Sequence, residues 1–256
     1  MPELRIHLFP YNSDNYGVLI HCKETGQTAA IDAGDGPALL AELEAKGWKL
    51  SHLFITHHHP DHTAGIETVK GKTGCQVIGP KERSQPIAGL DSHVDGGDNF
   101  DFAGRDVQVL FTPGHTTDMV NYFIPSEKLI FTGDTLFALG CGRIFEGTPE
   151  MMWDSLQVFL TLPENTLVYC GHEYTQANAA FALSVDPDNE MLQERANEVN
   201  RLRADNKPTV PSLLGIEHDT NPFLRPHDPA IRKHLSMENA SDAEVFAEIR
   251  KRKDNF

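Results

Sequence analysis

Four histidines and one aspartate lie within six positions of the stretch LFITHHHPDHTAG, residues 53 to 65, directly after an apolar run. In an extended chain alternate side chains face the same way, so His57 and His59 converge on one point while His58 faces away. A lone histidine is most often a hydrogen-bonded core or surface residue. The alternation and the density of this cluster favour a metal site instead.

Asp61 and His62 follow Pro60 at the expected start of a helix, where they present a carboxylate and an imidazole to a second point close to the first. One hard oxygen donor among nitrogen donors suits Zn²⁺, Fe²⁺ or Mn²⁺. No cysteine lies nearby, which argues against a structural zinc site.

Three further ligand-type residues each follow a glycine at the end of a later apolar run. They are His115 in TPGHTTD, Asp134 in FTGDTLF and His172 in YCGHEYT. Glycine lets the backbone turn tightly beside a ligand. Each residue alone is an ordinary turn residue, but the repeated pattern of strand, glycine and ligand type favours one shared site.

The elements that must position these residues are those of an α/β sheet protein. A helix is expected at about 37–47, with Pro near its start and Gly at its end, and another near 149–161. From residue 174 onward almost every segment is helical in pattern, and Ser241 with Glu244 has the spacing of a capping box. We therefore expect two domains, 1–173 and 174–256. The expected strands are 4–9, 16–22, 28–32, 52–56, 75–79, 106–112, 120–124, 128–133 and 166–171.

Composition narrows the function classes. The 256 residues carry a formal net charge of −15, which argues against a nucleic-acid partner and against docking on an anionic membrane. The N-terminal residues lack a basic region followed by an apolar one, no apolar run has the length of a membrane span, and the four cysteines form no CxxC pair. A cytoplasmic protein with reduced thiols is expected, and we expect a monomer.

Several motifs carry a resemblance to a known family. HxHxDH, with later His, Asp and His at strand ends, resembles the metallo-β-lactamase superfamily. THHHPDH, PGHT, GDTLF, GCGR, CGHEYT, NPFLR and the terminal RKRKDNF together resemble the hydroxyacylglutathione hydrolase (glyoxalase II) family over essentially the whole chain. The resemblance implies an αββα sandwich with a small C-terminal helical domain for substrate binding. The order of elements alone would also allow a doubly wound sheet.

The resemblance also implies a binuclear metal centre. One metal is expected on His57, His59 and His115, and the second on Asp61, His62 and His172. Asp134 is expected to bridge them, which leaves a position for a shared hydroxide. The metals are expected to be zinc first, with iron or manganese as alternatives.

The activity implied is hydrolysis of S-(2-hydroxyacyl)glutathione, such as S-D-lactoylglutathione, to glutathione and D-lactate, the second step of methylglyoxal detoxification. The metals would make hydroxide available near neutral pH, and Asp61 and Asp134 are the expected catalytic carboxylates. The leaving thiolate needs little protonation because a thiol has a pKa of about 8.5. Cys141, in GCGR, has no assigned base and is not expected to be the nucleophile.

Glutathione is an anion and the net charge of the chain repels it, so a local cationic site is needed. Arg250 and Lys253 in RKRKDNF lie three residues apart on one helix face and match the family's basic pair for the glycine carboxylate. Arg143 and Tyr174 match other glutathione contacts. Phe145 stands where some relatives have Tyr, and it cannot donate a hydrogen bond.

Other readings remain open at this stage. A persulfide dioxygenase with one iron, or a lactonase, would use the same scaffold. The presence of a full ligand set for a second metal argues against the dioxygenase. A lactonase would have no evident use for the basic C-terminal residues. A non-catalytic metal-binding module or a nucleic-acid-processing module is a third possibility, and the acidic charge disfavours the latter.

Overall fold

The computed structural model describes residues 3–256, which divide into two compact units. The first unit runs to Phe111 and resumes over Thr116–Gly133, and the second comprises Thr112–His115 and Asp134–Phe256. The domain boundary expected at residue 173 falls inside the second unit.

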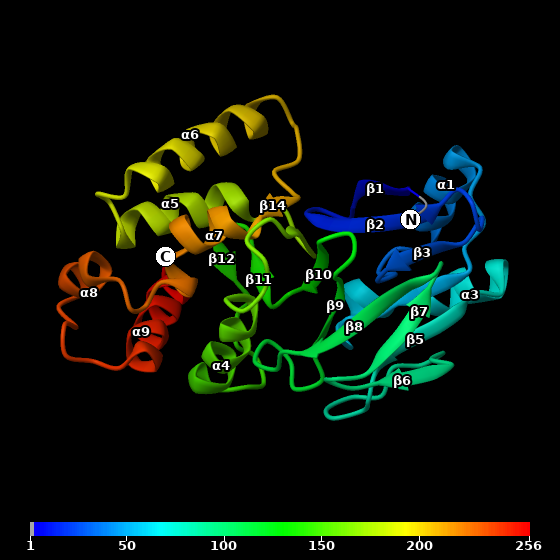
Figure 1. Cartoon of the computed structure of the whole chain (residues 1–256), viewed down its shortest axis with the longest axis horizontal. Coiled ribbons are helices and arrows are strands. Elements are labelled where there is room, and N and C mark those ends of the chain that lie inside the picture. Colours follow the sequence, from blue (N-terminus) through cyan, green and yellow to red (C-terminus); the bar gives the residue numbers. More distant parts are fainter. Residues whose placement is uncertain (1–2) are drawn as a thin grey trace. The chain divides into compact units, whose positions relative to one another are not determined.

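The first unit is built on a sheet whose strands follow one another in chain order. The first three strands pair antiparallel, with Leu4 opposite Cys22 and Tyr11 opposite Asn15, and the later ones pair parallel. Figure 1 shows β1, β2 and β3 as the blue ribbons at the N-terminal end. The strands are β1 (Leu4–Tyr11), β2 (Asn15–Cys22), β3 (Thr28–Ile31), β4 (His52–Phe54), β5 (Gln76–Pro80) and β6 (Ser92–Val94).

Helices α1 (Gly36–Lys46) and α3 (Ile66–Thr73) contribute to one apolar core with this sheet. The Asp35 side chain caps α1 by accepting the Ala38 N–H, and Gly47 ends it at φ 67°, a left-handed conformation that costs glycine little. Leu39 and Leu43 of α1 are nearly fully buried in the core. This helix was expected at 37–47, and the sequence signals at both of its ends are confirmed.

A second sheet in the first unit packs against the first. Its strands β7 (Asn99–Phe102), β8 (Arg105–Phe111), β9 (Val120–Ile124) and β10 (Leu129–Gly133) pair antiparallel in sequence. The Phe54 ring lies 5.7 Å from the Phe102 ring and 5.3 Å from the Tyr122 ring. The Tyr122 hydroxyl donates to the Ile55 carbonyl at 2.7 Å. Two stacked sheets, rather than one doubly wound sheet, therefore form this unit.

The second unit is mainly helical. Leu192, Ala196 and Val199 of α6 pack against Ala179 and Ala182 of α5 in a buried cluster. Helix α9 begins with the predicted capping box between Ser241 and Glu244. The elements are β11 (Leu136–Phe137), β12 (Gly140–Cys141), α4 (Pro149–Phe159), β13 (Leu167–Cys170), α5 (Thr175–Val185), α6 (Glu190–Ala204), β14 (Ser212–Leu213), α7 (Leu214–Thr220), the 3₁₀ helix η1 (Pro222–Leu224), α8 (Pro229–Leu235) and α9 (Asp242–Asp254).

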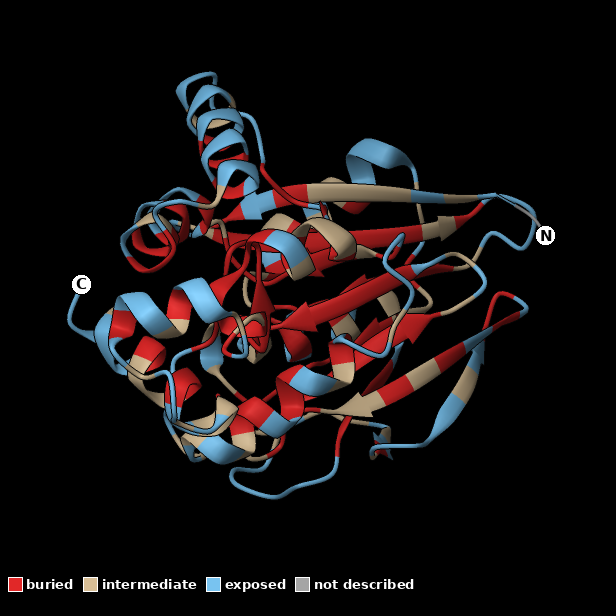
Figure 2. Ribbon diagram, turned by 60° about the vertical axis from the view of Figure 1, so that its left-hand side comes forward, coloured by how far each residue is buried: buried red, intermediate tan, exposed pale blue. Residues whose placement is uncertain are grey.

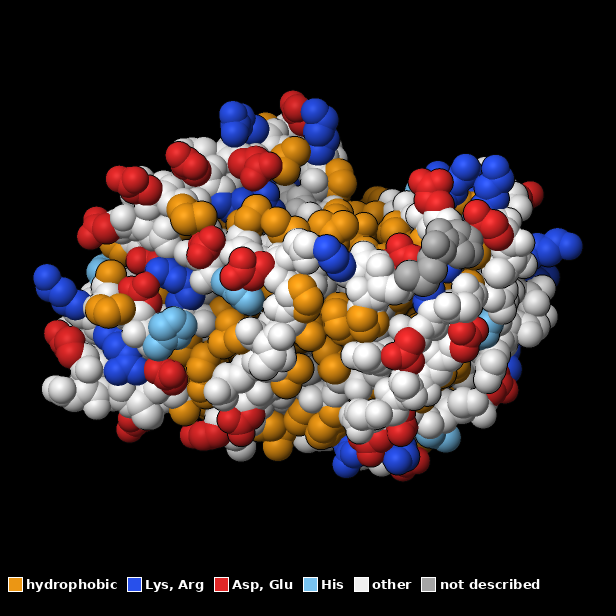
Figure 3. Space-filling view, in the orientation of Figure 1, with side chains coloured by type: hydrophobic (Ala, Val, Ile, Leu, Met, Phe, Trp, Pro, Cys, Tyr) orange, Lys and Arg blue, Asp and Glu red, His pale blue; other side chains and the backbone are white. Residues whose placement is uncertain are grey.

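Burial and charge follow the elements. The strands are largely buried, whereas the helices alternate buried and exposed faces (Figure 2). Acidic and basic side chains are intermixed on the face drawn in Figure 3. All four cysteines are free and buried. Across residues 3–256, helices of membrane-spanning length and apolarity are absent.

Candidate metal centre

The histidine cluster of the first unit lies on the chain that leaves β4. His57 is fully buried, and its Nε2 lies 3.1 Å from Nδ1 of His59. The other ring nitrogen of His57 lies 2.9 Å from the Thr56 hydroxyl, which leaves Nε2 to face His59. The alternation of side chains in this stretch therefore brings the rings of His57 and His59 together.

The next two residues of the cluster sit on a single helical turn, α2 (Pro60–Thr63). His59 precedes it with extended backbone angles, and Pro60 occupies its start, where its missing N–H is not needed. The turn places Oδ2 of Asp61 at 3.4 Å from Nε2 of His62. Gly34 permits this path, since a Cβ there would come within 1.7 Å of the Asp61 carbonyl oxygen.

His58 points to a different partner. Its Nδ1 lies 3.0 Å from both carboxylate oxygens of Asp118, and both residues are buried. The ring is therefore engaged away from the pair formed by His57 and His59. No motif in the sequence indicated Asp118 as the partner of His58.

In the second unit Asp134 is the centre of the ligand-type residues. Its Oδ2 lies 3.4 Å from Nε2 of His115 and 3.3 Å from Nε2 of His172. All three side chains are buried. Gly133, before Asp134, has a φ of 47°, so the backbone does turn in the left-handed region there.

These separations match a metal coordination shell. Ligands that bind zinc tetrahedrally with bonds of 2.0–2.1 Å lie about 3.3 Å from one another. The two pairs in the first unit are 3.1 and 3.4 Å apart, and the two pairs around Asp134 are 3.3 and 3.4 Å apart. The donor set and its spacing thus fit divalent metal ions within each unit separately.

Outer hydrogen bonds orient the rings, as is usual for metal-binding histidines. Asp32, directly after β3, has Oδ2 2.8 Å from Nδ1 of His62, and it also accepts the Thr56 N–H and hydroxyl. The Arg143 carbonyl oxygen lies 2.7 Å from Nδ1 of His115. Both contacts leave the Nε2 atoms directed at the carboxylates.

Asp61 is held in a similar way. The Asn15 amide donates to its Oδ2 at 2.9 Å, and the Tyr11 hydroxyl donates to its backbone carbonyl at 2.9 Å. Sequence reasoning missed Asp32, Asn15 and Tyr11. Of these three, Asp32 could have been predicted, because it too is a ligand-type residue at the end of a strand.

The residues expected to bind glutathione lie in the second unit. Arg250 is only 6 % exposed, and its guanidinium donates to the Cys141 carbonyl at 2.9 Å and to Asp254 at 3.1 Å. Asp254 also accepts from Nε of Arg143 at 3.3 Å. A carboxylate that the sequence reasoning did not include therefore joins these two arginines.

Lys253 is half-buried, and its ammonium donates to the Ala177 carbonyl at 3.1 Å. Burial, and next the positive charge of Arg250, lower the pKa of Lys253. A negatively charged ligand group would stabilise the Lys253 ammonium and so raise the pKa of Lys253 again.

Two aromatic side chains border the expected ligands. The Tyr174 ring stacks on the His172 ring with centroids 4.7 Å apart and an angle of 4° between the planes. The Phe145 ring lies 5.2 Å from the His115 ring and is 61 % exposed. Phe145 offers an apolar surface at this position and no hydrogen-bond donor.

Cys141 is buried, and desolvation raises the pKa of its thiol to about 11. Its Sγ lies 3.8 Å from Nη1 of Arg250, which only partly offsets the burial. The thiolate needed for nucleophilic attack is therefore scarce at neutral pH.

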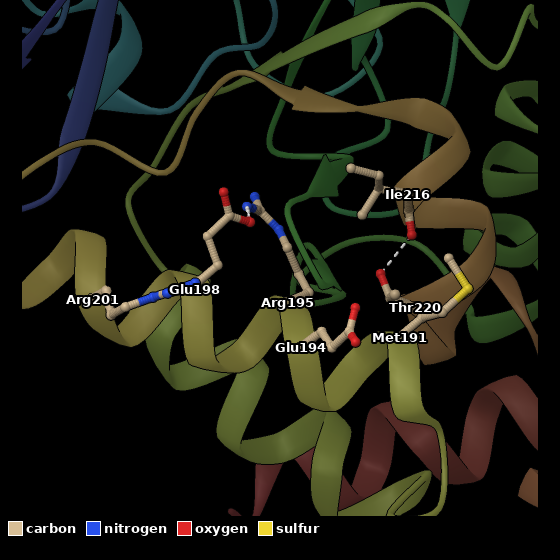
Figure 4. Close-up of a pocket in the computed structure, with 7 residues that line it drawn as sticks. All are labelled: Met191, Glu194, Arg195, Glu198, Arg201, Ile216 and Thr220. Atoms are coloured by element: carbon tan, nitrogen blue, oxygen red, sulfur yellow. Dashed lines mark hydrogen bonds and ion pairs between the residues drawn. The ribbon is translucent and has the colours of Figure 1, made fainter.

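A separate pocket of about 310 Å³ lies against α6 and α7 in the second unit (Figure 4). In it Arg195 points to Glu198 and donates to its carboxylate at 2.6 Å. None of the expected site residues lines it. The lining residues are Met191, Glu194, Arg195, Glu198, Arg201, Ile216 and Thr220.

Comparison with known proteins shows which superfamily has this fold. Residues 16–172 match the model of the metallo-β-lactamase superfamily. Among solved structures, ETHE1 from Myxococcus xanthus is 26 % identical with a TM-score of 0.69, covering 97 % of this chain and 90 % of that one. The BLEG-1 B3 metallo-β-lactamase has the same fold at 20 % identity and a TM-score of 0.65, covering 86 % of this chain and all of that one. The fold is thus that of the metallo-β-lactamase superfamily, and its histidine and aspartate clusters indicate divalent metal binding.

The family within that superfamily follows from the rest of the chain. Residues 173–256 match the model described as hydroxyacylglutathione hydrolase C-terminus. The hydroxyacylglutathione hydrolase of Rhizobium meliloti (strain 1021) is 54 % identical over the full length of both chains. That of Brucella ovis is 54 % identical over 254 residues, 99 % of each chain. The chain belongs to the hydroxyacylglutathione hydrolase family.

Proposed function

We propose that the chain hydrolyses S-(2-hydroxyacyl)glutathione thioesters, with S-D-lactoylglutathione as substrate and glutathione and D-lactate as products. The observation that carries this proposal is the 54 % identity, over the complete chain, to a protein named hydroxyacylglutathione hydrolase. This reaction is the second step of methylglyoxal detoxification.

We assign the metal ligands from the family pattern. In that pattern one ion would be held by His57, His59 and His115, the other would be held by Asp61, His62 and His172, and Asp134 would be the shared ligand. The support is that each neighbouring pair measured within one unit has the spacing of ligands on a shared metal. Two divalent ions, zinc first and iron or manganese as alternatives, would supply Lewis acidity and an acidified water at this site.

The residues of the chain have separate roles around that chemistry. Asp61, held by Asn15 and Tyr11, keeps a carboxylate oxygen directed at His62 and orients the attacking water. Asp134 is the second catalytic carboxylate, and its Oδ2 lies 3.4 Å from Nε2 of His115 and 3.3 Å from Nε2 of His172. The glutathione thiolate leaves without a proton from the protein, because a thiol has a pKa of only about 8.5. The raised pKa of Cys141 supports a mechanism with no protein nucleophile.

Glutathione is proposed to bind through the second unit. Arg250 and Lys253 of α9 attract its glycine carboxylate, and Arg143 and Tyr174 contact the rest of the tripeptide. Phe145 contributes apolar contact only. The lowered pKa of Lys253 and the exposure of Arg143 support this assignment, because both side chains gain from an anionic partner.

The wider assignments stay as proposals from the sequence. We propose a catalytic domain over 1–173, a substrate-binding domain over 174–256, a monomeric state and a cytoplasmic location. The four free cysteines fit a reducing compartment. Light scattering of the purified protein tests the monomer.

A steady-state assay of S-D-lactoylglutathione with the zinc-loaded protein tests the main proposal. Release of glutathione, followed with a thiol reagent, at a kcat/KM of about 10⁴ M⁻¹s⁻¹ or more would place the protein in the range of ordinary enzymes on their substrates. Parallel assays with a lactone and with glutathione persulfide serve as the comparison. Turnover of either of these without thioester hydrolysis would overturn the proposal.

A further inference from the structure

The hairpin between β11 and β12 has an unusual turn. Leu136 pairs with Cys141 and Phe137 with Gly140, so only Ala138 and Leu139 make the turn. Leu139 has a φ of 56°, in the left-handed region that an L-residue with a side chain rarely adopts. Its side chain is fully buried in the apolar cluster of α5 and α6. A strained turn of this kind persists only where its surroundings fix it.

Three polar side chains fix the backbone of this turn. Glu217 accepts the Leu139 N–H at 2.7 Å. The Asn221 amide donates to the carbonyls on both sides of the turn, at 3.2 Å to Phe137 and 3.0 Å to Gly140. Asn178 of α5 donates to the Ala138 carbonyl at 3.1 Å.

Glu217 and Asn221 also hold each other. The Asn221 amide donates to the Glu217 carboxylate at 3.1 Å, and Oδ1 of Asn221 accepts the Phe223 N–H at the start of η1. Both side chains are fully buried, and burial raises the pKa of Glu217. A buried carboxylate is costly, and buried charged groups are weak evidence of a role in stability. Because Glu217 binds the backbone of the turn, it has a role in the geometry of the hairpin.

The hairpin carries residues that the proposed function uses. Asp134 lies two residues before β11, and Arg143 lies two residues after β12. The Phe137 ring packs edge-on against His172 at 6.0 Å and Tyr174 at 5.4 Å. The Cys141 carbonyl at its other end accepts from Arg250. Movement of this hairpin would therefore displace the neighbours of the expected glutathione contacts.

We propose that Glu217 and Asn221 are positioning residues for glutathione, acting through the hairpin Leu136–Cys141 that they clamp. They do not contact the substrate. The proposal rests on the proposed function for the identity of the ligand, and it assigns a role to the asparagine of the NPFLR motif and to the helix that precedes it.

The first test is the Asn221→Ser variant of the zinc-loaded full chain. Serine is a good helix cap and keeps an acceptor for the Phe223 N–H, but it cannot reach the two carbonyls of the hairpin. We expect KM for S-D-lactoylglutathione and the dissociation constant of glutathione, measured by calorimetry, each to rise about tenfold, the equivalent of one lost hydrogen bond. The fold-change in kcat should be smaller than the fold-change in KM, because the hairpin contacts Tyr174 and Arg250, which are expected to bind glutathione.

A pair of substitutions at Glu217 separates the hydrogen bond from the charge. Glu217→Gln keeps an acceptor for the Leu139 N–H, and both constants should stay within about twofold of the wild type. Glu217→Met removes the acceptor at similar volume and should match Asn221→Ser. Hydrogen exchange of the Leu139 amide should be faster in Glu217→Met and in Asn221→Ser.

Leu235→Ala, in the core of α8, is the control for a general loss of stability. The variants are compared at temperatures equally far below their Tm values. If Asn221→Ser and Glu217→Met raise KM no more than Leu235→Ala does, the two residues are merely structural and the proposal is wrong. If the wild type binds glutathione but does not hydrolyse the thioester, the proposed function fails, and the glutathione dissociation constants of the variants still decide the positioning role. A wild type that binds no glutathione overturns both.

Discussion

The two groups of expected metal ligands are assembled in different ways. In the first unit four ligands come from six consecutive positions, His57 to His62, and one strand end plus one turn of helix presents them. In the second unit His115, Asp134 and His172 come from three separate loops, each after a different strand. Local backbone geometry decides the first group, whereas the second needs the whole fold. The first group was therefore the easier to predict.

The hydrogen bonds that orient the expected metal ligands also differ between the two groups. Side-chain carboxylates and amides support the first group, with Asp32 on His62 and Asn15 on Asp61. A backbone carbonyl, that of Arg143, supports His115 in the second. Substitutions can remove the first kind of support but not the second, which makes the comparison testable.

The largest effect is expected at Asp134, because its Oδ2 lies within 3.4 Å of Nε2 of both His115 and His172. Asp134→Ala should lower kcat/KM by about 10²- to 10³-fold, the size typical when one group that stabilises charge in the transition state is removed. Inductively coupled plasma mass spectrometry of the Asp134→Ala variant should find fewer than two metal ions per chain. Asp154→Ala, an exposed aspartate on α4, is the matched control and should keep activity and metal. Full metal content in Asp134→Ala would exclude Asp134 as a bridging ligand.

A smaller effect is expected for the support of the first group. Asp32→Asn removes the carboxylate beside Nδ1 of His62 and should weaken one metal site by about 10- to 100-fold, as is typical for outer-shell partners. Competition with a chromophoric chelator measures the affinity. Asp35→Asn is the control, because asparagine caps α1 as well as aspartate does. Equal metal affinity in the two variants would show that Asp32 only stabilises the fold.

The two cations of α9 should differ from each other. Lys253→Ala and Arg250→Ala should each raise KM by about tenfold, with kcat little changed, if both bind the glutathione carboxylate. Arg250→Ala should in addition lower Tm, because the buried guanidinium also holds the Cys141 carbonyl and Asp254. Kinetics and thermal melts in parallel measure both effects. Lost turnover at an unchanged KM would contradict their role in binding.

The smallest effect on metal binding is expected at His58. His58→Ala should keep both metals, because Nδ1 of His58 is engaged by the Asp118 carboxylate and the residue belongs to neither expected ligand set. The free energy of unfolding should fall by about 1–3 kcal/mol, since a buried carboxylate loses a hydrogen-bond partner. Elemental analysis and urea unfolding measure the two quantities. Loss of one metal would overturn the argument from alternating side chains.

Most of the regular elements were predictable because their local signals agree with the fold. The strand 120–124 has the predicted bounds, and α1 and α9 have the predicted caps. Strands β6, β7, β11, β12 and β14 were missed, and the last three have only two residues each, too few for any periodicity to appear. Helix α7 was missed as well, within a region of prolines and asparagines that indicated loops.

In the candidate site the expected ligands were predictable from the sequence, but their hydrogen-bond partners were not. Ligand types and spacing indicated the expected metal ligands, and the family resemblance assigned them to two ions; both assignments stay predictions. The partners Asp118, Asp254 and Glu217 could not be found from the sequence, because each contacts a residue at least 60 positions away. An aspartate or glutamate outside a motif carries no sign of which distant amide or guanidinium it will meet.

The anchored turn at Ala138 and Leu139 bears on how this protein can be re-engineered. All four residues from Phe137 to Gly140 have a backbone group held by a buried side chain, and a Cβ on Gly140 would lie 2.4 Å from the Asn178 amide. A library that randomises this turn, or changes its length, would mostly return misfolded clones. Diversity aimed at new thioesters belongs instead at a more exposed side chain such as Phe145, which is 61 % exposed.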